Sequence, residues 1–502
     1  MSISELFTTL NQSLWVWLAT DVLLWALFVL FLCSLWIIIR SPLQRVVWQK
    51  VFRQRLAVVS AVLLAVTAGI ALLDSIHLRE PLPQLTPEAS VRYGVEVNSV
   101  LDLILTDLRK NHEKTYSAPL AVHLAALEPV TVTLADGSVE VRREAPRLKV
   151  AGANFPPGPI SDSEYWLDVL KRAGLGALGG AGVFLMGCLV GALLRRKIGL
   201  TQMVNATAWR LTAYTLGVIL IMGGVFTGLS SNFHVFGTDK VGQDVLYQVL
   251  KSLRTALVIG LVPTLVTLPL GIALGLSAGY FRGKVDDVIQ YIYTTVSAIP
   301  GVLLIAASVL SIQVMIDNHP EWFATAVERG DIRLLALCII LGMTSWTGIA
   351  RLLRGEALKM REYEYVQAAR VFGVSAAQIL LRHVLPNVFP IILITLVMEF
   401  SSLVLAEAVL SYIGIGVDPT MFSFGLMINN ARMELAREPM VWWSLTAAFG
   451  FMFLLVLAAN LFADAVRIQF HSRPEFLGTL VEGIAVFSPD GRFLSANRSA
   501  QF

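Results

Sequence analysis

The chain has 502 residues, of which 56% are apolar and only 15% are charged, and its net charge is +3. An ordinary soluble domain carries about 25% charged residues, so this composition indicates an integral membrane protein. Nucleic-acid binding is not indicated, because the sequence contains no basic block interleaved with aromatic residues. Three cysteines, Cys33, Cys188 and Cys338, lie far apart in apolar runs, which argues against a disulfide framework and a metal site.

Nine apolar runs are long enough to cross a hydrocarbon core of about 30 Å as helices. A barrel is not expected, since its strands would be shorter and would alternate in polarity. The first run is expected to be a retained span, because its basic flank follows it instead of preceding it as in a signal peptide. The runs are residues 18–39, 56–73, 174–194, 211–229, 255–280, 288–313, 334–350, 388–414 and 441–463.

Basic residues in the short loops set the expected orientation, because cationic flanks stay on the cytoplasmic side during insertion. The segment RSPLQRVVWQKVFRQR follows the first run, and residues 195–197 (RRK) follow the third. Six further basic residues lie between Arg351 and Arg382. With nine spans, the N-terminus is expected outside, the C-terminus in the cytoplasm, and residues 74–173 in the extracytoplasmic space.

Residues 74–173 have the composition of a small soluble domain. In LTPEASVRYGVEVNSVLDLILTDLRK, Thr86 as N-cap, Pro87 at the first helical position and apolar residues at helical spacing predict a helix. In VTVTLADGSVEVRR, apolar and polar residues alternate around Asp136-Gly137, which predicts a tight β-hairpin. An α+β insert is therefore expected, and a sensor, a docking platform and a structural spacer are all compatible roles.

A charged, helix-prone segment, REYEYVQAARVFGVSAAQILLRHVLPN, lies between two of the apolar runs at Arg361–Asn387. Glu364 lies in the first turn of a predicted helix, where it meets the positive end of the dipole. Gly373 is placed to end that helix in the left-handed conformation, and Ser375 has capping-box spacing for a second helix. Pro386 is expected to close the unit. The alternative is an amphipathic cytoplasmic loop lying on the lipid surface, which is the commoner case for such a segment in membrane proteins generally.

The tail RPEFLGTLVEGIAVFSPDGRFLSANRSAQF shows a second hairpin signal, around Asp490-Gly491. It resembles the opening helix and first two strands of a PAS sensor domain, but it is shorter than a complete one. A tail that packs on its neighbours is the alternative.

The spacing within Arg361–Asn387 is more specific than its composition. It resembles the EAA loop of ABC-importer permeases, and Gln367-Ala368-Ala369, Gly373 and Leu385-Pro386 match the spacing of that family. Gln367 stands where the family has glutamate, which replaces a charge by a neutral hydrogen-bonding group.

Other stretches resemble the C-type permease subunit of dipeptide, oligopeptide and nickel importers. FGTDKVGQDV (Phe236–Val245) is similar to that subunit's Gly-Thr-Asp-x-x-Gly-Arg-Asp-Val motif, with Gln243 in place of Arg. The resemblance extends over residues 205–470 and is also carried by LSAGYFRGKVDDVI, ARLLRGEALKMREYEYVQAAR and LAEAVLSYIGIGVDP.

The resemblance implies an all-α polytopic membrane protein with a six-span type I ABC importer permease core, its spans lying between residues 211 and 463. Three extra spans and the α+β extracytoplasmic insert precede this core. The expected domains are two N-terminal spans with a basic cytoplasmic loop (1–73), the extracytoplasmic domain (74–173), a third span with a basic linker (174–204), the permease core (205–470) and the PAS-like cytoplasmic tail (471–502).

The resemblance also implies a role for the loop, whose short helices dock on a cytoplasmic ATPase in this family. The chain has no Gly-x4-Gly-Lys-[Ser/Thr] loop to cradle phosphates, so ATP and Mg are expected on partner subunits and this chain is expected not to be an enzyme. The expected coupling residues are Glu364, Gln367, Ala368, Ala369, Gly373, His383, Leu385 and Pro386.

The implied partners are a second homologous permease, two cytoplasmic ABC ATPase subunits, an extracytoplasmic substrate-binding protein and membrane lipid, in a bacterial cytoplasmic (inner) membrane. The binding protein is expected at the outer mouth, on FGTDKVGQDV and on Tyr412–Gly425. The residues expected there are Gly237, Thr238, Asp239, Gly242, Asp244, Gly414 and Gly416.

Polar residues within spans tend to face protein or a water-filled path, because they are costly in lipid. Glu399 and Glu407 are expected either to contact substrate or to brace neighbouring spans, and bracing is favoured for Glu407. Pro300 removes a backbone hydrogen bond inside the sixth run and is expected to kink it, either beside a path or for structural reasons alone.

A membrane sensor is the alternative function, with the insert as an external ligand domain and the PAS-like tail as its cytoplasmic end. No recognisable output domain supports it, and it does not explain why the loop and the Gly-Thr-Asp motif occur together. Within the importer hypothesis, dipeptides, longer peptides, peptide antibiotics and nickel all remain open as substrates.

Overall fold

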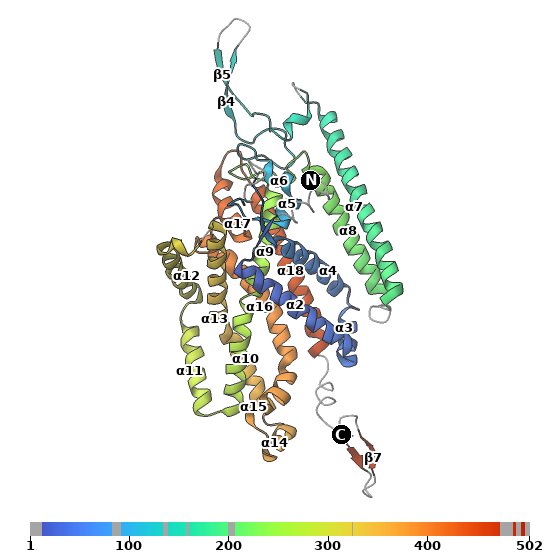
Figure 1. Cartoon of the computed structure of the whole chain (residues 1–502), viewed down its shortest axis with the longest axis vertical. Helices are drawn as coiled ribbons and strands as arrows, with labels where there is room; N and C mark the ends of the chain where they lie inside the picture. The colour runs from blue at the N-terminus through green and yellow to red at the C-terminus, as the bar shows by residue number, and fades with distance from the viewer. Residues whose placement is uncertain are drawn as a thin grey trace.

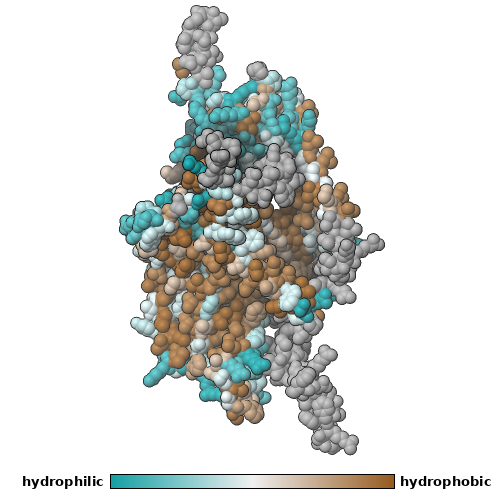
Figure 2. All heavy atoms as spheres, viewed as in Figure 1, coloured by the Kyte–Doolittle hydropathy of each residue, from teal (hydrophilic) through white to brown (hydrophobic). Residues whose placement is uncertain are grey.

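The computed structural model describes residues 13–82, 92–133, 139–156, 160–198, 206–323, 325–471, 485–487 and 493–496. Within these ranges nine helical segments are long and apolar enough to cross a membrane, which confirms the nine predicted spans. Figure 2 shows a broad hydrophobic band across the visible face, with hydrophilic residues gathered toward the two ends. The nine segments are Ala19–Arg40, Arg55–Asp74, Asp162–Leu189, Ala208–Ser230, Val245–Phe281, Gly301–Asn318, Ala326–Met360, Ala376–Ile413 and Trp443–Gln469.

The N-terminal part contributes two long helices joined by a short one. Their elements are β1 (Leu14–Val16), α2 (Ala19–Arg40), α3 (Pro42–Val51) and α4 (Arg55–Asp74). The insert then supplies β2 (His77–Arg79), β3 (Asn98–Ser99), α5 (Val100–Ile104), α6 (Thr106–Lys110), β4 (Glu128–Thr133) and β5 (Val139–Glu144). A third long helix, α7 (Asp162–Ile198), leads to the core, whose first span is α8 (Ala206–Ser230).

The core is a bundle of helices with the short helices α14 and α15 at one end (Figure 1). Its further elements are α9 (Val245–Leu261), α10 (Thr264–Phe281), α11 (Lys284–Ala298), α12 (Gly301–Asn318), α13 (Ala326–Met360), α14 (Glu364–Val371), α15 (Ala376–Ile379), α16 (Leu385–Ile413), α17 (Phe424–Arg432) and α18 (Trp443–His471). The largest buried cluster joins α9, α16 and α18, and α4 of the N-terminal part packs against it through Ala71.

The insert is α+β, as predicted, but its helix begins later than expected. Residues 92–97 form no helix, and Thr86 lies outside the described residues. Ser99 is the N-cap of α5 and forms a complete capping box with Asp102, a stronger local start signal. Strands β1, β2 and β3 form an antiparallel sheet, so the segment before α2 is tied to the insert.

The predicted hairpin in the insert is present as the antiparallel pair β4 and β5, in register from Glu128 opposite Glu144 to Thr133 opposite Val139. It projects from the body (Figure 1). In the tail, β6 (Ala485–Phe487) and β7 (Phe493–Ala496) also pair antiparallel, as the second hairpin signal predicts. Both turn dipeptides, and the rest of the PAS-like stretch, lie outside the described residues.

The sixth apolar run is broken, not kinked as predicted. α11 ends at Ala298, and Pro300 is the N-cap of α12 with ψ of 114°. Ile299 is extended because the ring of a following proline disfavours the helical conformation, and the proline cannot donate the next helical hydrogen bond. Only α12 therefore qualifies as a span in this region.

Helices α7 and α8 pack with their backbones in close approach along a glycine seam. A Cβ on Gly176 would lie 2.2 Å from the carbonyl oxygen of Gly224, and one on Gly180 would lie 2.3 Å from that of Leu220. Small residues permit this kind of contact between helices in lipid, where packing drives association.

Replacing Gly224 by alanine should therefore weaken the α7–α8 pair by about 1–3 kcal/mol through overpacking. The neighbouring Gly223 is the matched control, because a Cβ there meets nothing within 4 Å. Its replacement by alanine should be neutral or slightly stabilising. Proteolysis of the two variants in mild detergent would compare them, and equal resistance would contradict the seam.

Candidate functional site

Helices α14 and α15 form a compact pair at the end of the molecule opposite the insert (Figure 1). α14 ends at Val371, and Gly373 follows with φ of +78°, which confirms the predicted left-handed helix end. Ser375 caps α15 by accepting from the amide of Gln378, as its spacing predicts. We call residues 364–379 the helix pair below.

The helix pair does not close at Pro386, contrary to the prediction. α15 continues through a π-helical turn, Leu380–Val384, directly into α16. Pro386 lies in the first turn of α16, where a proline is tolerated although it has no backbone N–H to donate. The wider π turn comes directly before it and lets the helix continue past this position. The second helix is thus joined to a membrane span without an intervening loop.

Buried side chains fix the helix pair on the spans. Val366 of α14 and Ile379 of α15 pack in one apolar cluster with Leu276 of α10 and Leu353 of α13. Val384 of the π turn completes the cluster. The pair is therefore braced against two spans as well as being continuous with a third.

The structure gathers the predicted coupling residues around this unit. Gln367, at the position where the resemblance is imperfect, donates from Nε2 to the carbonyl of Glu362 at 3.1 Å and so supports the first turn. The ring of His383 lies 6.3 Å from that of Tyr365. Glu364, Gln367, Ala368 and Ala369 lie on α14, Gly373 in the turn, His383 in the π turn, and Leu385 and Pro386 at the start of α16.

The exposed apolar side chains at the tip of the unit were not singled out from sequence. Val371 is 86% exposed, Phe372 is 85% exposed and Leu381 is 67% exposed. Exposed apolar groups gathered on one end of a protein indicate a contact surface. The only sequence signal was their position beside Gly373.

At the opposite end, Phe236–Val245 folds as a tight loop between α8 and α9. Gly237 and Gly242 have φ of +72° and +78°, which favours glycine. Asp244 is the N-cap of α9 and accepts from the amide of Leu246 at 2.8 Å. Asp239 accepts from two amides of its own loop and from Gln248.

The insert covers this loop. A Cβ on Gly237 would lie 2.3 Å from the carbonyl oxygen of Ser117, and one on Gly242 would lie 1.9 Å from that of Glu113. The amide of Ser117 donates to the hydroxyl of Thr238 at 2.7 Å. Thr238 and Asp244 are completely buried as a result.

His234 joins the insert to the same loop. Its Nδ1 lies 2.8 Å from a carboxylate oxygen of Asp244, and its Nε2 lies 3.7 Å from one of Glu113. Burial opposes the charged ring, but the hydrogen bond to Asp244 and the negative charges of Asp244 and Glu113 prevail and raise the pKa of His234 to about 9. At neutral pH the ring is therefore a cation held between two anions.

Alkaline pH should weaken this junction. The pKa of His234 is about 9 in the folded protein, above its ordinary value of 6.5. A raised pKa stabilises the folded state fully below pH 6.5, and that contribution is lost as the pH rises to about 9. The midpoint temperature of thermal unfolding in detergent should fall across this pH window, and it should fall less for the His234→Gln variant. Parallel profiles for the two proteins would contradict the assignment.

Two cations of α9, the buried Arg254 and the partly buried Lys251, are paired by the N-terminal extension, by which we mean residues 1–204. Arg254 donates to Asp21 of α2 at 2.6 Å and to the hydroxyl of Thr20 at 3.1 Å. Asp331 of α13 lies 3.5 Å from the same guanidinium and also bonds Thr20. His77 of β2 lies 2.7 Å from Asp21 and completes the group.

Lys251, one turn earlier on α9, is paired in the same way. Its Nζ lies 2.6 Å from Asp74 at the end of α4 and 3.0 Å from Asp102 of α5. Tyr247 donates to Asp102 at 2.7 Å. Both carboxylates that pair with Lys251 among the described residues thus come from the N-terminal extension.

The two acidic residues of α16 have different surroundings. Glu407 is 3% exposed and accepts from the hydroxyl of Ser411 at 2.6 Å. Glu399 is half-buried, beside the exposed Met398. At the end of α16, Gly414 has φ of +89°, and a Cβ on Gly416 would lie 1.9 Å from the Ser411 hydroxyl.

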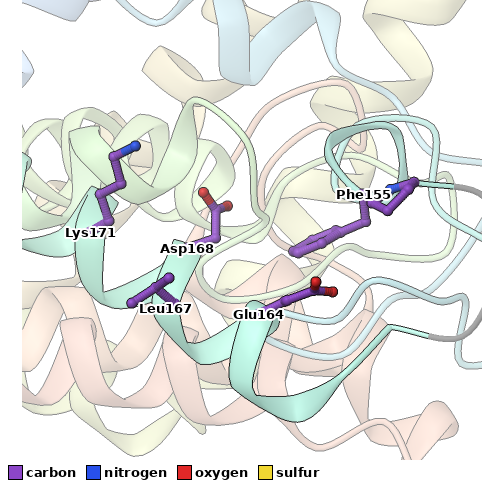
Figure 3. A pocket seen from close by; sticks show the side chains of 6 residues that line it. Phe155, Glu164, Leu167, Asp168 and Lys171 are labelled. Carbon is purple, nitrogen blue, oxygen red and sulfur yellow. The ribbon is translucent and has the colours of Figure 1, made fainter.

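Figure 3 shows an open pocket of about 290 Å³ beside the start of α7. Asp168 there is already paired with Arg172 at 2.7 Å. In the part of the chain that the structure describes, no group of three or more His, Cys, Asp or Glu side chains could hold a metal ion. The pocket is lined by Phe155, Pro156, Glu164, Leu167, Asp168 and Lys171, and we assign it no role.

Comparison with known proteins places this membrane fold among transport permeases. The family described as "Binding-protein-dependent transport system inner membrane component" matches residues 271–470, from within α10 into α18. The glutathione transport system permease protein GsiD of Pectobacterium atrosepticum is 31% identical over 239 residues, which is 47% of this chain and 72% of that protein.

Two further relatives are of the same type. The dipeptide permease DppC of Lactococcus lactis is 30% identical over 240 residues, 48% of this chain and 64% of that protein. The oligopeptide permease OppC of Mycobacterium bovis is 27% identical over 234 residues, 47% of this chain and 74% of that protein. The chain belongs to the family of binding-protein-dependent ABC importer permeases, as a C-type subunit, which confirms the resemblance.

Proposed function

We propose that this chain is one permease of an ATP-driven importer for peptides or related small solutes, and that the helix pair receives the motion of a partner ATPase. The observation that carries this proposal is the exposure of Val371 and Phe372 at the tip of a braced unit. In water such a surface is costly, so a protein contact that covers it is favourable.

The helix pair is built to pass motion to the spans. Its continuity with α16 through the π turn means that a displacement of α15 tilts or rotates that span. The apolar cluster around Val366 and Ile379 carries the same displacement to α10 and α13. Small shifts at a docking surface are amplified in this way when packed elements move as bodies.

The proposed assembly contains a second homologous permease, two cytoplasmic ATPase subunits that bind ATP and Mg, and an extracytoplasmic substrate-binding protein. The basic flanks of the spans support a proposed orientation with the helix pair in the cytoplasm and the insert outside an inner membrane. The N-terminus is then extracytoplasmic and the C-terminus cytoplasmic. The proposed domains of the chain are residues 1–73, 74–173, 174–204, 205–470 and 471–502.

The binding protein is proposed to dock at the insert-bearing end. The segment Tyr412–Gly425, with Gly414 and Gly416, contacts the start of α9 there, because the ring of Phe422 packs against that of Tyr247 at 5.6 Å. The loop just before α9 contains Gly237, Thr238, Asp239, Gly242 and Asp244. Residues 113–117 cover that loop and bury four of these residues, so the expected direct contact of Gly237, Thr238, Gly242 and Asp244 with a binding protein is corrected. In this proposal the insert takes their place in the docking surface. Glu407 is proposed to brace α16, since it bonds Ser411 of its own helix, whereas Glu399 and Pro300 are proposed to lie nearer the path.

Peptides are the proposed substrate class because the three relatives are named for dipeptide, oligopeptide and glutathione transport. A tagged chain should co-purify with two ATPase subunits and a second permease, and deletion of its gene should reduce peptide uptake. Purification alone, with uptake unchanged, would contradict the proposal. Mass spectrometry of the ligand carried by the cognate binding protein would then identify the substrate.

A further inference from the structure

The connection between α2 and α4 has an unusual charge pattern. No aspartate or glutamate occurs from Val22 to Leu73, whereas five basic residues occur there. They lie within and beside α3, at the end of the N-terminal helices away from the insert. The five are Arg40, Arg45, Lys50, Arg53 and Arg55. The helix pair also lies on the side away from the insert, farther from it than α3 (Figure 1).

One face of α3 is fixed to the core. Val51 is fully buried in a cluster with Ala465 and Val466 of α18, and the ring of Trp48 stacks on Phe462 at 6.5 Å. At 3.6 residues per turn, Arg45 and Lys50 lie about 110° to either side of the face formed by Val47, Trp48 and Val51. Their aliphatic stems can therefore run along the packed helix while their charges point to the membrane surface.

These cations lack carboxylate partners within the described chain. None of the five forms an ion pair with a carboxylate that the structure describes, and Asp464 on the same stretch of α18 is exposed without pairing to them. Arg40 stacks over the ring of Trp36 at 3.9 Å, an arrangement suited to the membrane interface. A cation without a counterion near an anionic membrane surface is attracted to it by about 1 kcal/mol.

We propose that α3 and its flanks bind the headgroups of anionic phospholipids in the leaflet next to the helix pair. Phosphate oxygens supply the negative charge that Arg45 and Lys50 lack among the described residues. A rigid amphipathic helix with cations on both sides of its packed face holds such a headgroup against α18. The proposal concerns the N-terminal extension alone and does not depend on what the permease transports.

The test uses the full chain in vesicles of equal parts phosphatidylglycerol and phosphatidylcholine. After extraction in mild detergent, native mass spectrometry measures the ratio of the two lipids that stay bound. The double variant Arg45→Gln/Lys50→Gln leaves three basic residues to set topology. Since each cation near an anionic surface contributes about a fivefold preference, the double variant should lower the bound ratio at least fivefold.

Two matched variants make the result specific. Arg45→Lys/Lys50→Arg conserves the charge and should keep most of the phosphatidylglycerol. Arg370→Gln/Arg382→Gln removes two cations that also lie on the side of the molecule away from the insert and should change little.

Equal ratios for the wild type and the Arg45→Gln/Lys50→Gln variant would overturn the proposal, as would a loss confined to the Arg370→Gln/Arg382→Gln variant. Displacement of the lipid by millimolar inorganic phosphate would also overturn it, because the site would then be a general phosphate site.

Discussion

Replacing Asp21 by asparagine should destabilise the protein by about 3–5 kcal/mol, the usual effect of removing one partner from a buried ion pair. Asparagine keeps the shape of the side chain but removes the charge that faces Arg254 at 2.6 Å. Arg254 is then left buried with only the more distant Asp331 as a counterion. Chemical denaturation in mild detergent measures the change in the free energy of unfolding.

The exposed pair Arg282–Glu362, at 2.6 Å, provides the control in the same chain. Glu362→Gln should cost about 0–1 kcal/mol, since water solvates both groups. Adding Arg254→Gln to Asp21→Asn should recover part of the first loss, because the orphaned charge is removed. If the double variant loses as much stability as Asp21→Asn and Arg254→Gln lose separately when added together, Asp21 and Arg254 are not coupled. The ion group would then not hold the extension to the core.

Replacing Gly373 by valine should abolish ATPase-driven transport while membrane insertion stays normal. A β-branched residue is strongly disfavoured at a φ of +78°, so the turn between α14 and α15 must rearrange. Space is not the cause, since a Cβ there meets nothing within 4 Å. Peptide uptake, and stimulation of the partner ATPase in vesicles, measure the loss.

Gly373→Asn is the matched control, because asparagine tolerates the left-handed conformation, and it should keep most of the activity. Gly355→Val adds the same side chain to an open position within α13 and should be harmless to coupling. Loss of insertion in Gly373→Val would show a folding role for the turn. Full coupling in Gly373→Val would show that the turn plays no part in transmission.

The spans and the helix pair could be predicted because their signals are local. Apolar length defines a span, and Gly373 and Ser375 act on their immediate neighbours. Three local predictions were wrong. The capping box at Ser99 starts the helix later than the Thr86 signal, and the π turn before Pro386 lets the helix continue. Pro300 ends one helix and begins another, where a kink within one helix was expected.

The junction between the extension and the core could not be predicted, because it joins residues far apart in the chain. Asp21 and Arg254 are 233 positions apart, and neither stands in a recognisable motif. The cover over Gly242 likewise depends on Glu113, which only the folded insert brings there. The exposure of a side chain also depends on the whole fold, so the exposed contact surface at Val371 and Phe372 could not be predicted from the sequence.

The pairing of Lys251 and Arg254 has a consequence for the status of the N-terminal extension. Both cations come just before the uncharged stretch 255–280, and the extension supplies their partners Asp21, Asp74 and Asp102. Removing one partner from a buried ion pair leaves an uncompensated charge, which is strongly destabilising. The extension is therefore an integral part of the folded permease, and a chain trimmed to residues 205–470 should be much less stable than the full chain.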